Sequence, residues 1–301
     1  MNPPDPAPAA NRQDTLIRPQ RGTARWLTSE VGVMGILNLT PDSFSDGGRW
    51  SDPALALQQA GRMLRQGARV LDLGAQSTRP GAEIIGPEDE LKRLLPTLIA
   101  IRAAHPEALL SVDTFHAAVA AAALAAGADW INDLSAGRAD PAMASLLAER
   151  GCPCVLMHSR GDSQSMDSLS TYNDVVEEVR LELLRSSDRM LAAGVRRDQI
   201  IWDPGLGFAK TADQNLELLR GLHRLGGEGF PLLVGPSRKR FIGAVLNEPR
   251  PRARLWGTAA VCVQAVQQGA SLLRVHDVGP IVQAVQMAAA LRPDPQNTSR
   301  G

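Results

Sequence analysis

An alternation that repeats eight times is the strongest constraint on how this chain can fold: a short apolar segment is followed by a longer segment with helical periodicity. The short segments are apolar on both faces, which is typical of parallel strands covered by helices. Eight such repeats favour a single-domain α/β fold, the (β/α)8 TIM barrel, over an open, doubly wound sheet. The expected strands are Val31–Leu39, Val70–Leu73, Leu109–Val112, Trp130–Asn132, Pro153–Met157, Ile200–Trp202, Pro231–Val234 and Leu272–Val275.

Glycines mark the ends of four expected helices. Each stands just past a helical segment, where a left-handed residue ends the helix and glycine adopts that conformation without a steric penalty. The segment boundaries are therefore marked chemically as well as by periodicity. The glycines are Gly67, Gly127, Gly194 and Gly269, and the expected helices include Pro53–Gln66, Glu88–Ala104, Ala117–Ala126, Asn173–Ala193, Gln214–Leu225, Arg252–Gln268 and Gly279–Leu291.

The two ends of the chain differ in composition from its middle. Residues 1–25 are rich in proline and poor in apolar side chains, so they cannot offset the entropy cost of ordering and are expected to be a disordered tail. Residues 26–291 form the expected barrel, and the polar residues 292–301 form a second tail. No secretory signal or membrane-spanning apolar run is evident, so we expect a cytoplasmic protein that does not bind membranes.

Charge and cysteine content argue against several classes of partner. Lys plus Arg and Asp plus Glu both number 32, so no overall positive field attracts nucleic acid, and an anion site has to come from a local basic cluster. Cys152 and Cys154 are too close in sequence for a structural disulfide, and Cys262 provides no second pair for a zinc site. We interpret all three as reduced thiols in the core.

Polar residues follow nearly every expected strand at once. Because the carboxyl ends of barrel strands converge on one rim, these residues are expected to form a single constellation. The alternative is that each one caps the next helix, which fits Thr114 and Asp133 equally well but does not suit Lys239 or Arg274, since neither is expected at a helix N-cap. The residues are Asn38, Asp72, Asp113, Asn132, Asp133, His158, Asp203, Ser237, Arg238, Lys239, Arg274, His276 and Asp277.

Seven ordered motifs coincide with these strand ends. They are MGILNLTPDSFSDGG at 34–48, STRPGA at 77–82, SVDT at 111–114, IND at 131–133, DPGLGFAKT at 203–211, GPSRKRFIG at 235–243 and RVHDV at 274–278. A single short match would carry little weight, but the ordered set spans almost the whole expected barrel. In this set the chain resembles the dihydropteroate synthases.

The resemblance implies an enzyme that joins 6-hydroxymethyl-7,8-dihydropterin pyrophosphate to 4-aminobenzoate in folate biosynthesis, giving 7,8-dihydropteroate and pyrophosphate. A pterin edge presents a ring NH, an amino group and a carbonyl, which carboxylate, amide and ammonium groups recognise by hydrogen bonding. By resemblance, this edge is held by Asp113, Asn132, Asp203 and Lys239, and the slot for the ring is lined by Met157, Gly207, Phe208 and Gly235.

The resemblance also implies how the leaving group is handled. Arg274 is expected to stack over the pterin ring and, with Lys239 and His276, to stabilise charge on the departing pyrophosphate. Mg²⁺ is the implied cofactor and Asn38 its matched residue, since one amide oxygen with phosphate oxygens and waters makes a suitable shell. A structural role is the alternative for Asn38. No catalytic nucleophile is evident. Pyrophosphate is a good leaving group and the electron-rich pterin can share cationic charge, so a dissociative substitution is expected, in which the amine attacks the pterin methylene after pyrophosphate departs.

The second substrate is expected at the first two βα loops. By resemblance, the walls of the 4-aminobenzoate site include Phe44, Asp46, Thr78 and Arg79. The sequence GAQ at 74–76 departs from the family pattern, where GGE is more common, so a negative charge is missing at Gln76. His158 also stands at a strand end, but we expect it to have a core role rather than a direct role in the chemistry.

Two other functions fit parts of the pattern. A pterin-binding methyltransferase module shares a barrel and a pterin pocket, but it does not require the PDSFSDGG, STRPG or SRK segments. A barrel that keeps the pocket only for binding is the second alternative. The family is commonly dimeric, so a homodimer is expected, with the apolar final helix pair as its surface.

Overall fold

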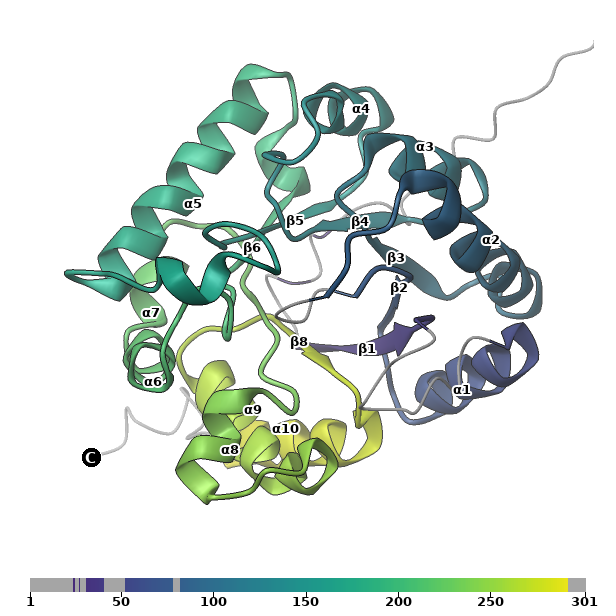
Figure 1. Ribbon diagram of the computed structural model, residues 1–301. Helices are drawn as coiled ribbons and strands as arrows, with labels where there is room; N and C mark the ends of the chain where they lie inside the picture. Colours follow the sequence, from purple (N-terminus) through teal and green to yellow (C-terminus); the bar gives the residue numbers. More distant parts are fainter. Residues whose placement is uncertain (1–23, 25–26, 28–30, 41–51, 78–81, 292–301) are drawn as a thin grey trace, which may run out of the picture.

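The computed structural model describes residues 24, 27, 31–40, 52–77 and 82–291, which form an eight-stranded barrel surrounded by helices (Figure 1). The strand pairings are parallel, in the order β6-β5-β4-β3-β2-β1-β8-β7. A parallel bridge between Trp202 and Leu232 joins the two outer strands of this order, so the prediction of a (β/α)8 barrel is confirmed. The strands are β1 (Gly32–Asn38), β2 (Val70–Gly74), β3 (Leu109–Asp113), β4 (Trp130–Asp133), β5 (Cys154–Met157), β6 (Ile200–Asp203), β7 (Leu233–Val234) and β8 (Leu272–Val275).

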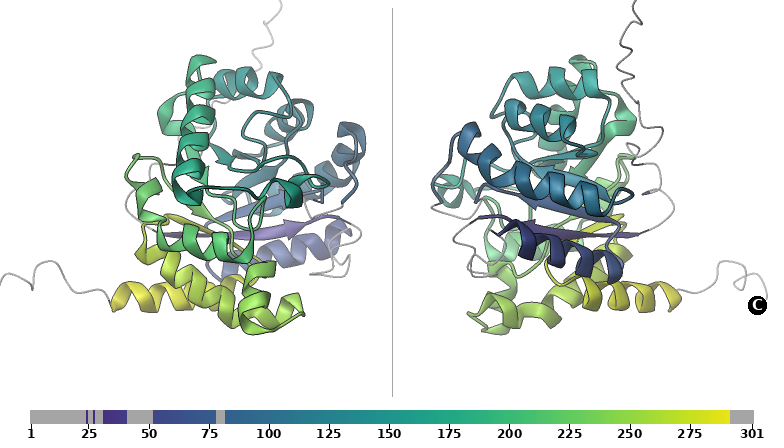
Figure 2. Two further views of the ribbon diagram at one scale, coloured as in Figure 1. Left: turned by 60° about the vertical axis from the view of Figure 1, so that its left-hand side comes forward. Right: turned by 90° about the vertical axis from the view of Figure 1, so that its right-hand side faces the viewer.

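The helices cover the outside of the barrel, as the two side views in Figure 2 show. Three short 3-10 turns at Met166–Leu169, Arg197–Gln199 and Pro251–Arg254 complete the connections in the described residues. The helices are α1 (Pro53–Arg65), α2 (Pro87–Ala104), α3 (Ala117–Ala125), α4 (Ala142–Arg150), α5 (Val175–Ala192), α6 (Ala212–Arg220), α7 (His223–Gly226), α8 (Arg240–Leu246), α9 (Leu255–Gln267) and α10 (Val278–Ala290).

The helical prediction differs from the structure at four places. Helices α4 and α8 are not among those expected from the sequence; both are short, and their N-cap residues make no side-chain capping bond. The expected helix Gln214–Leu225 is divided into α6 and α7 at Gly221, where a Cβ would lie 2.7 Å from the Val176 side chain. The expected helix Arg252–Gln268 begins as a 3-10 turn before α9.

The ends of the other helices agree with the sequence. The four glycines expected past helix ends have φ between +94° and +104°, the left-handed region that ends a helix. The cysteines are buried and free, as expected. Within the described residues, no helix combines the length and the apolar character needed to cross a bilayer. Residues 1–23 and 292–301 lie outside the description, so the two tails stay predictions.

The interior of the barrel has an apolar layer near the amino ends of its strands. Alternate residues of a strand face inward, so the inward positions nearer the carboxyl ends come two residues later. There the inward side chains are polar: Asp72 follows Val70, and Arg274 follows Leu272. The apolar layer is made of Met34, Val70, Trp130, Val155, Ile201, Leu233 and Leu272, packed with Ala24 and Leu27.

Candidate active site

Arg274 is the centre of a hydrogen-bonded group just beyond this apolar layer. Its Nε donates to Asp72 Oδ2 at 2.6 Å, and its Nη2 donates to Asp113 Oδ2 at 2.8 Å. Asn132 Nδ2 donates to the same Asp72 oxygen at 3.0 Å. These side chains come from β8, β2, β3 and β4, so barrel closure brings together residues that are up to 202 positions apart in sequence.

The group is almost dry. Asp72 and Asn132 are 0% and 1% exposed, and within the described part of the chain Asp72 Oδ1 and Asn132 Oδ1 have no hydrogen-bond partner. Burial raises the pKa of Asp113 to about 8, and Asp72 adds to this effect while Arg274 opposes it. Burial lowers the pKa of Arg274, but the carboxylates of Asp72 and Asp113 outweigh burial and leave that pKa raised. Two buried acceptors are thus available for ligand donors.

Asp203 and Lys239 are two further buried ionisable groups at the mouth of the barrel, close enough to influence each other's pKa. Asp203 Oδ1 accepts a 2.7 Å bond from the Gly205 amide, which leaves Oδ2 available to a ligand. Burial raises the pKa of Asp203, opposed by the Gly205 amide and by the Lys239 ammonium. Burial also lowers the pKa of Lys239 to about 8, opposed by Asp203. Burial therefore disfavours the charged form of both groups, and each favours the charged form of the other.

Lys239 lies against the segment that follows β6. Its Nζ is 4.2 Å from the centroid of the Phe208 ring, a cation–π contact. A Cβ on Gly207 would come within 3.0 Å of Lys239 Cδ, and Gly207 has a φ of +78°, so both space and backbone conformation require glycine there. Gly235 similarly lies against Arg274, whose Cβ would be 3.8 Å from an added Cβ.

The loops after β7 and β8 are joined by Ser237 and His276. Ser237 Oγ lies 2.9 Å from His276 Nδ1 and accepts from the His276 amide at 3.1 Å. Next to them, Arg238 forms a two-pronged ion pair with Asp277, with distances of 3.1 and 2.9 Å. These bonds hold the His276 ring in place directly after β8, two residues beyond Arg274.

The expectations about capping are partly wrong. Lys239 does stand at the N-cap of α8, because the chain enters that helix directly after Arg238, whose φ is +61°. Its side chain makes no capping bond, so it is free for the site. Asp133 accepts from the amides of Ser135 and Gly137 and stabilises a loop, not the start of α4. Thr114 Oγ1 accepts from the amide of His116, the N-cap of α3.

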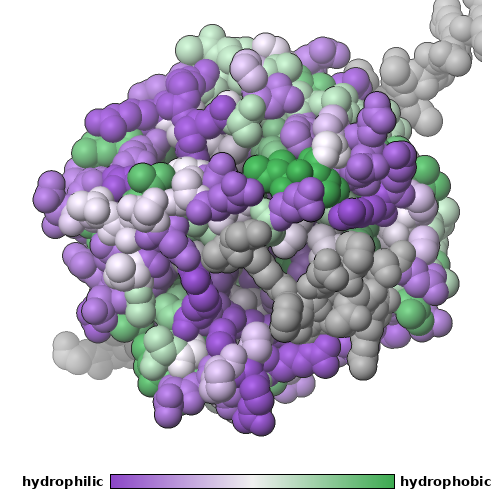
Figure 3. All heavy atoms as spheres, viewed as in Figure 1, coloured by the Kyte–Doolittle hydropathy of each residue, from purple (hydrophilic) through white to green (hydrophobic). Residues whose placement is uncertain are grey.

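An apolar cavity of about 150 Å³ is connected to the polar site through Phe208, which contacts Lys239, and Met157, which pairs with Asp203, whereas Arg274 and its partners do not line it. Met157 and Phe208 line it from β5 and the β6 loop, and Gln76 lines it from the β2 loop. In Figure 3, which looks onto this face, apolar surface lies near the centre within a mostly hydrophilic surround. The other lining residues include Ile84, Phe115, Leu134 and Met166, which give the cavity an apolar wall suited to a flat ring.

Asn38 ends β1 at the same rim. Its Oδ1 would lie 3.8 Å from a Cβ on Gly74, and Asp113 Oδ2 would lie 3.6 Å from that point, so the amide and the carboxylate flank one glycine. Among the described residues, no group of three His, Cys, Asp or Glu side chains could hold a metal. The Asn38 amide oxygen is a donor of the kind that Mg²⁺ takes when ligand oxygens and waters complete its shell.

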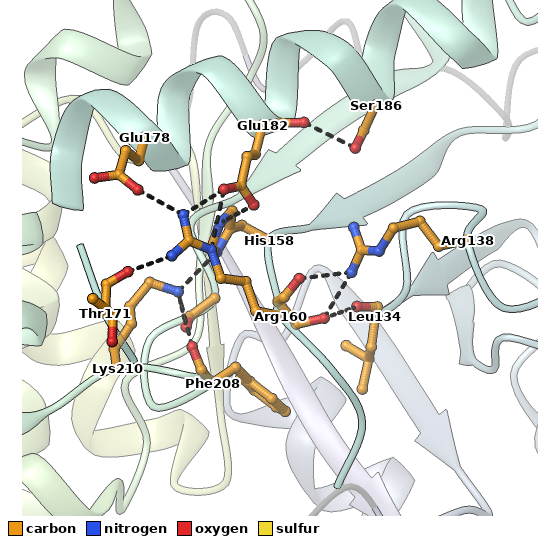
Figure 4. Close-up of polar contacts among 12 residues, drawn as sticks. Leu134, Arg138, His158, Arg160, Thr171, Glu178, Glu182, Ser186, Phe208 and Lys210 are labelled. Carbon is orange, nitrogen blue, oxygen red and sulfur yellow. Dashed lines mark hydrogen bonds and ion pairs between the residues drawn. The ribbon is translucent and has the colours of Figure 1, made fainter. Parts of the chain in front are cut away.

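The sequence analysis includes Asp72 among the rim residues but gives it no role, and Lys210 is not singled out from the sequence at all. Asp72 is an acid inside the apolar strand VLDLG, and that pattern is the signal that a buried partner exists. Lys210 contacts His158, which is 2% exposed and has the core position expected (Figure 4). The remaining expected site residues, Phe44, Asp46, Thr78 and Arg79, lie outside the described residues.

Comparison with known proteins gives the family. Residues 34–276 match the model of the pterin binding enzyme family. The dihydropteroate synthase of Synechocystis sp. is 48% identical over 259 residues, which are 86% of this chain and 89% of that protein.

Solved structures agree with the sequence comparison. The Xanthomonas albilineans dihydropteroate synthase with 4-aminobenzoic acid has a TM-score of 0.82 and 41% identity, over 89% of this chain and 95% of that chain. The same protein in complex with 7,8-dihydropteroate has a TM-score of 0.79 and 38% identity over the same shares. The chain therefore belongs to the pterin binding enzymes, and among them to the dihydropteroate synthases.

Proposed function

We propose that the barrel mouth binds 6-hydroxymethyl-7,8-dihydropterin pyrophosphate and 4-aminobenzoate and joins them to 7,8-dihydropteroate, with release of pyrophosphate. The observation that carries this proposal is the buried group around Arg274, because its acceptors and donors match a pterin edge beside an apolar slot. Related proteins of this fold have been solved with 4-aminobenzoic acid and with 7,8-dihydropteroate, which supports the same substrates here.

Four side chains are proposed to bind the pterin edge. Asn132 Oδ1 and Asp203 Oδ2 accept from the ring NH and amino groups, since Asn132 Oδ1 is buried without a partner among the described residues and Asp203 keeps one oxygen unused by Gly205. Lys239 donates to a ring acceptor. Asp113 is held toward the ring by Arg274. A ligand that lacks these polar groups leaves buried atoms unpaired, which costs more than a lost apolar contact.

The departing pyrophosphate is assigned to the β8 end of the rim. Arg274 and His276 supply donors there, and Lys239 adds a charge when it is protonated. Asn38 is the residue proposed to hold Mg²⁺, which when bound neutralises phosphate charge and stabilises the leaving group. The bond between the pterin methylene and pyrophosphate breaks, the amine of 4-aminobenzoate then attacks the methylene and releases a proton to solvent, and the protein supplies orientation and electrostatic stabilisation.

A homodimer is supported by an apolar surface on the last three helices. Trp256 is 76% exposed and Leu291 is 70% exposed, which is costly for large apolar side chains that stay in water. Figure 2 shows α8, α9 and α10 side by side at one edge of the barrel. We propose this surface as the dimer interface and the cytoplasm as the location. The other exposed members of the surface are Val245, Leu246 and Met287.

The dimer is tested by analytical ultracentrifugation of the intact chain. Trp256→Glu places a charge in the proposed interface, so we expect it to convert a species of twice the 32.2 kDa chain mass to monomer. Ile99→Glu is the matched control, because Ile99 is 54% exposed on α2, away from that surface. A monomeric wild-type protein would contradict the proposal.

The reaction is tested with purified protein, the dihydropterin pyrophosphate, 4-aminobenzoate and Mg²⁺. We expect 7,8-dihydropteroate and pyrophosphate in equal amounts, and a chelator should reduce the rate. Binding of the pterin without product would instead indicate a barrel that only binds. Methyl transfer from a methylated pterin to a corrinoid acceptor would indicate the methyltransferase alternative.

A further inference from the structure

A buried chain of hydrogen bonds joins the loops after β5 and β6, next to the proposed substrate contacts (Figure 4). Lys210 Nζ lies 2.9 Å from His158 Nδ1, and His158 Nε2 lies 3.0 Å from Glu182 Oε2. The other Glu182 oxygen accepts from Arg160, which also donates to the Thr171 carbonyl at 2.6 Å. None of these groups has a part in the chemistry proposed above.

The geometry fixes the protons of the chain. Lys210 Nζ has three neighbours, His158 Nδ1 and the carbonyls of Gly205 and Phe208, and an ammonium has three donors for them. His158 must then accept at Nδ1 and donate from Nε2 to Glu182. A neutral lysine has two donors for the two carbonyls, so His158 would have to donate to it from Nδ1, and with Glu182 at Nε2 the ring would then have to be a charged imidazolium. Burial lowers the pKa of Lys210 to about 7 and that of His158 to about 4, so the lysine is the more basic of the two groups and keeps the proton while the ring stays neutral.

Lys210 holds a segment whose backbone is unfavourable on its own. Gly205 and Gly207 have φ values of +66° and +78°, and Ala209, which has a Cβ, has a φ of +49°. A non-glycine residue in this region costs about 1–2 kcal/mol, so surrounding contacts have to stabilise it. The Lys210 ammonium donates to the carbonyls of Gly205 and Phe208, each at 3.0 Å, and these two hydrogen bonds stabilise the segment.

The same segment forms the support of Lys239. The Phe208 ring lies 4.2 Å from Lys239 Nζ, and Gly207 packs against the Lys239 stem. Phe208 also lines the apolar cavity. A shift of the Phe208 carbonyl would therefore move both the Phe208 ring, which is a wall of the pterin slot, and the Lys239 ammonium that the ring contacts.

We infer that Lys210 is a positioning residue for the pterin site: through the Gly205 and Phe208 carbonyls it fixes the Phe208 ring that supports Lys239, and neutral His158 holds Lys210 in place. This inference rests on the proposed function and adds to it two residues that do not touch substrate. It also explains why an ionisable pair lies in the core, since only a charged donor with three bonds can hold three acceptors at once.

A double-mutant cycle tests the inference. Calorimetry measures binding of the dihydropterin pyrophosphate, without 4-aminobenzoate, to Lys210→Met in the wild-type and in the Phe208→Ala background. If Lys210 acts through the ring, its loss weakens binding by about 10-fold in the first background and by less than about 3-fold in the second. Equal factors in both backgrounds, or no loss in either, overturn the inference.

Lys92→Met is the matched control, because Lys92 is an exposed lysine on α2 that pairs with Asp89. Its affinity should stay within about 2-fold of the wild-type value. The wild-type titration separates the two proposals. No binding to wild-type protein refutes the proposed function, whereas wild-type binding with an unaltered Lys210→Met variant refutes only the positioning role.

A pair of His158 variants keeps the inference testable if Lys210→Met does not fold. His158→Gln retains one acceptor for Lys210 and one donor for Glu182, whereas His158→Phe retains the ring shape but neither polar group. We expect affinity within about 3-fold of wild type for the Gln variant and a loss of about 10-fold for the Phe variant. Equal losses in folded samples of both variants would overturn the role of His158.

Discussion

The Arg274 guanidinium bridges two carboxylates from different strands, with Nε 2.6 Å from Asp72 and Nη2 2.8 Å from Asp113. Arg274→Lys should weaken this bridge, because a single ammonium does not reproduce the planar fork that reaches both acids. One buried acid is then left without its partner. We expect a loss of about 2–4 kcal/mol in the free energy of unfolding, measured by urea denaturation.

Arg240→Lys is the control for this change. Arg240 pairs with Asp167 at 2.7 Å, but both side chains are more than half exposed, so the loss should be below about 1 kcal/mol. Equal losses at both positions would show that the bridge has no special role in stability.

Asp203 presents one free carboxylate oxygen to the site, because its other oxygen accepts from the Gly205 amide. Asp203→Asn retains the acceptor for Gly205 but turns a donor toward the donors of the pterin. Binding of the dihydropterin pyrophosphate should weaken by about 2–4 kcal/mol in calorimetry. Asp167→Asn, the same change at an exposed acid, should leave affinity unaltered, and a loss at Asp203 of less than about threefold would exclude this role.

Lys239 gives the reaction a pH dependence on the alkaline side. Burial lowers the pKa of Lys239 to about 8, so its ammonium is present below that pH and is lost above it. Because kcat/KM reports ionisation in the free enzyme, kcat/KM for the pterin substrate should fall as pH rises through about 8. Lys239→Arg keeps its charge throughout this range and should flatten the profile. An unchanged alkaline limb in that variant would assign the ionisation to another group.

Gly205 lies where no side chain fits. Its φ is +66°, and a Cβ there would be 1.8 Å from the His158 carbonyl oxygen. Gly205→Ala should therefore cost more than about 3 kcal/mol in the free energy of unfolding. Gly226→Ala is the contrast, because its nearest neighbour is 3.8 Å away and its φ is ordinary, so stability should stay the same or rise by up to about 1 kcal/mol. Similar thermal unfolding of both variants would contradict the steric argument.

Each of the eight expected strands overlaps a strand of the structure, because short runs that are apolar on both faces are typical of parallel strands covered by helices. The sequence also predicted that Asp113, Asn132 and Arg274 converge, since the ends of parallel strands meet at one rim. It did not predict that Asp72 is the acid that joins Arg274 to Asn132. Which face of a four- or five-residue strand points inward is settled by closure of the sheet, and not by local pattern.

The contact between Lys210 and His158 was beyond sequence reasoning for a different reason. The two residues are 52 positions apart, and no local rule relates them. Helix α4 was missed because it is nine residues long and begins after Pro141 without a capping side chain. Short elements without terminal signals are stabilised by the neighbours they pack on, which a single sequence does not display.

The apolar layer around Met34, Val70 and Trp130 fills the amino end of the barrel in the described residues, so we expect ligands to reach the site from the carboxyl ends of the strands. A molecule bound at Asn132 can dissociate only through the space that the second reactant occupies. Two reactants that use the same opening have to bind in a fixed order, because the one that lies deeper has to enter first. The joined product then has to withdraw by the same route before another deep reactant can be loaded.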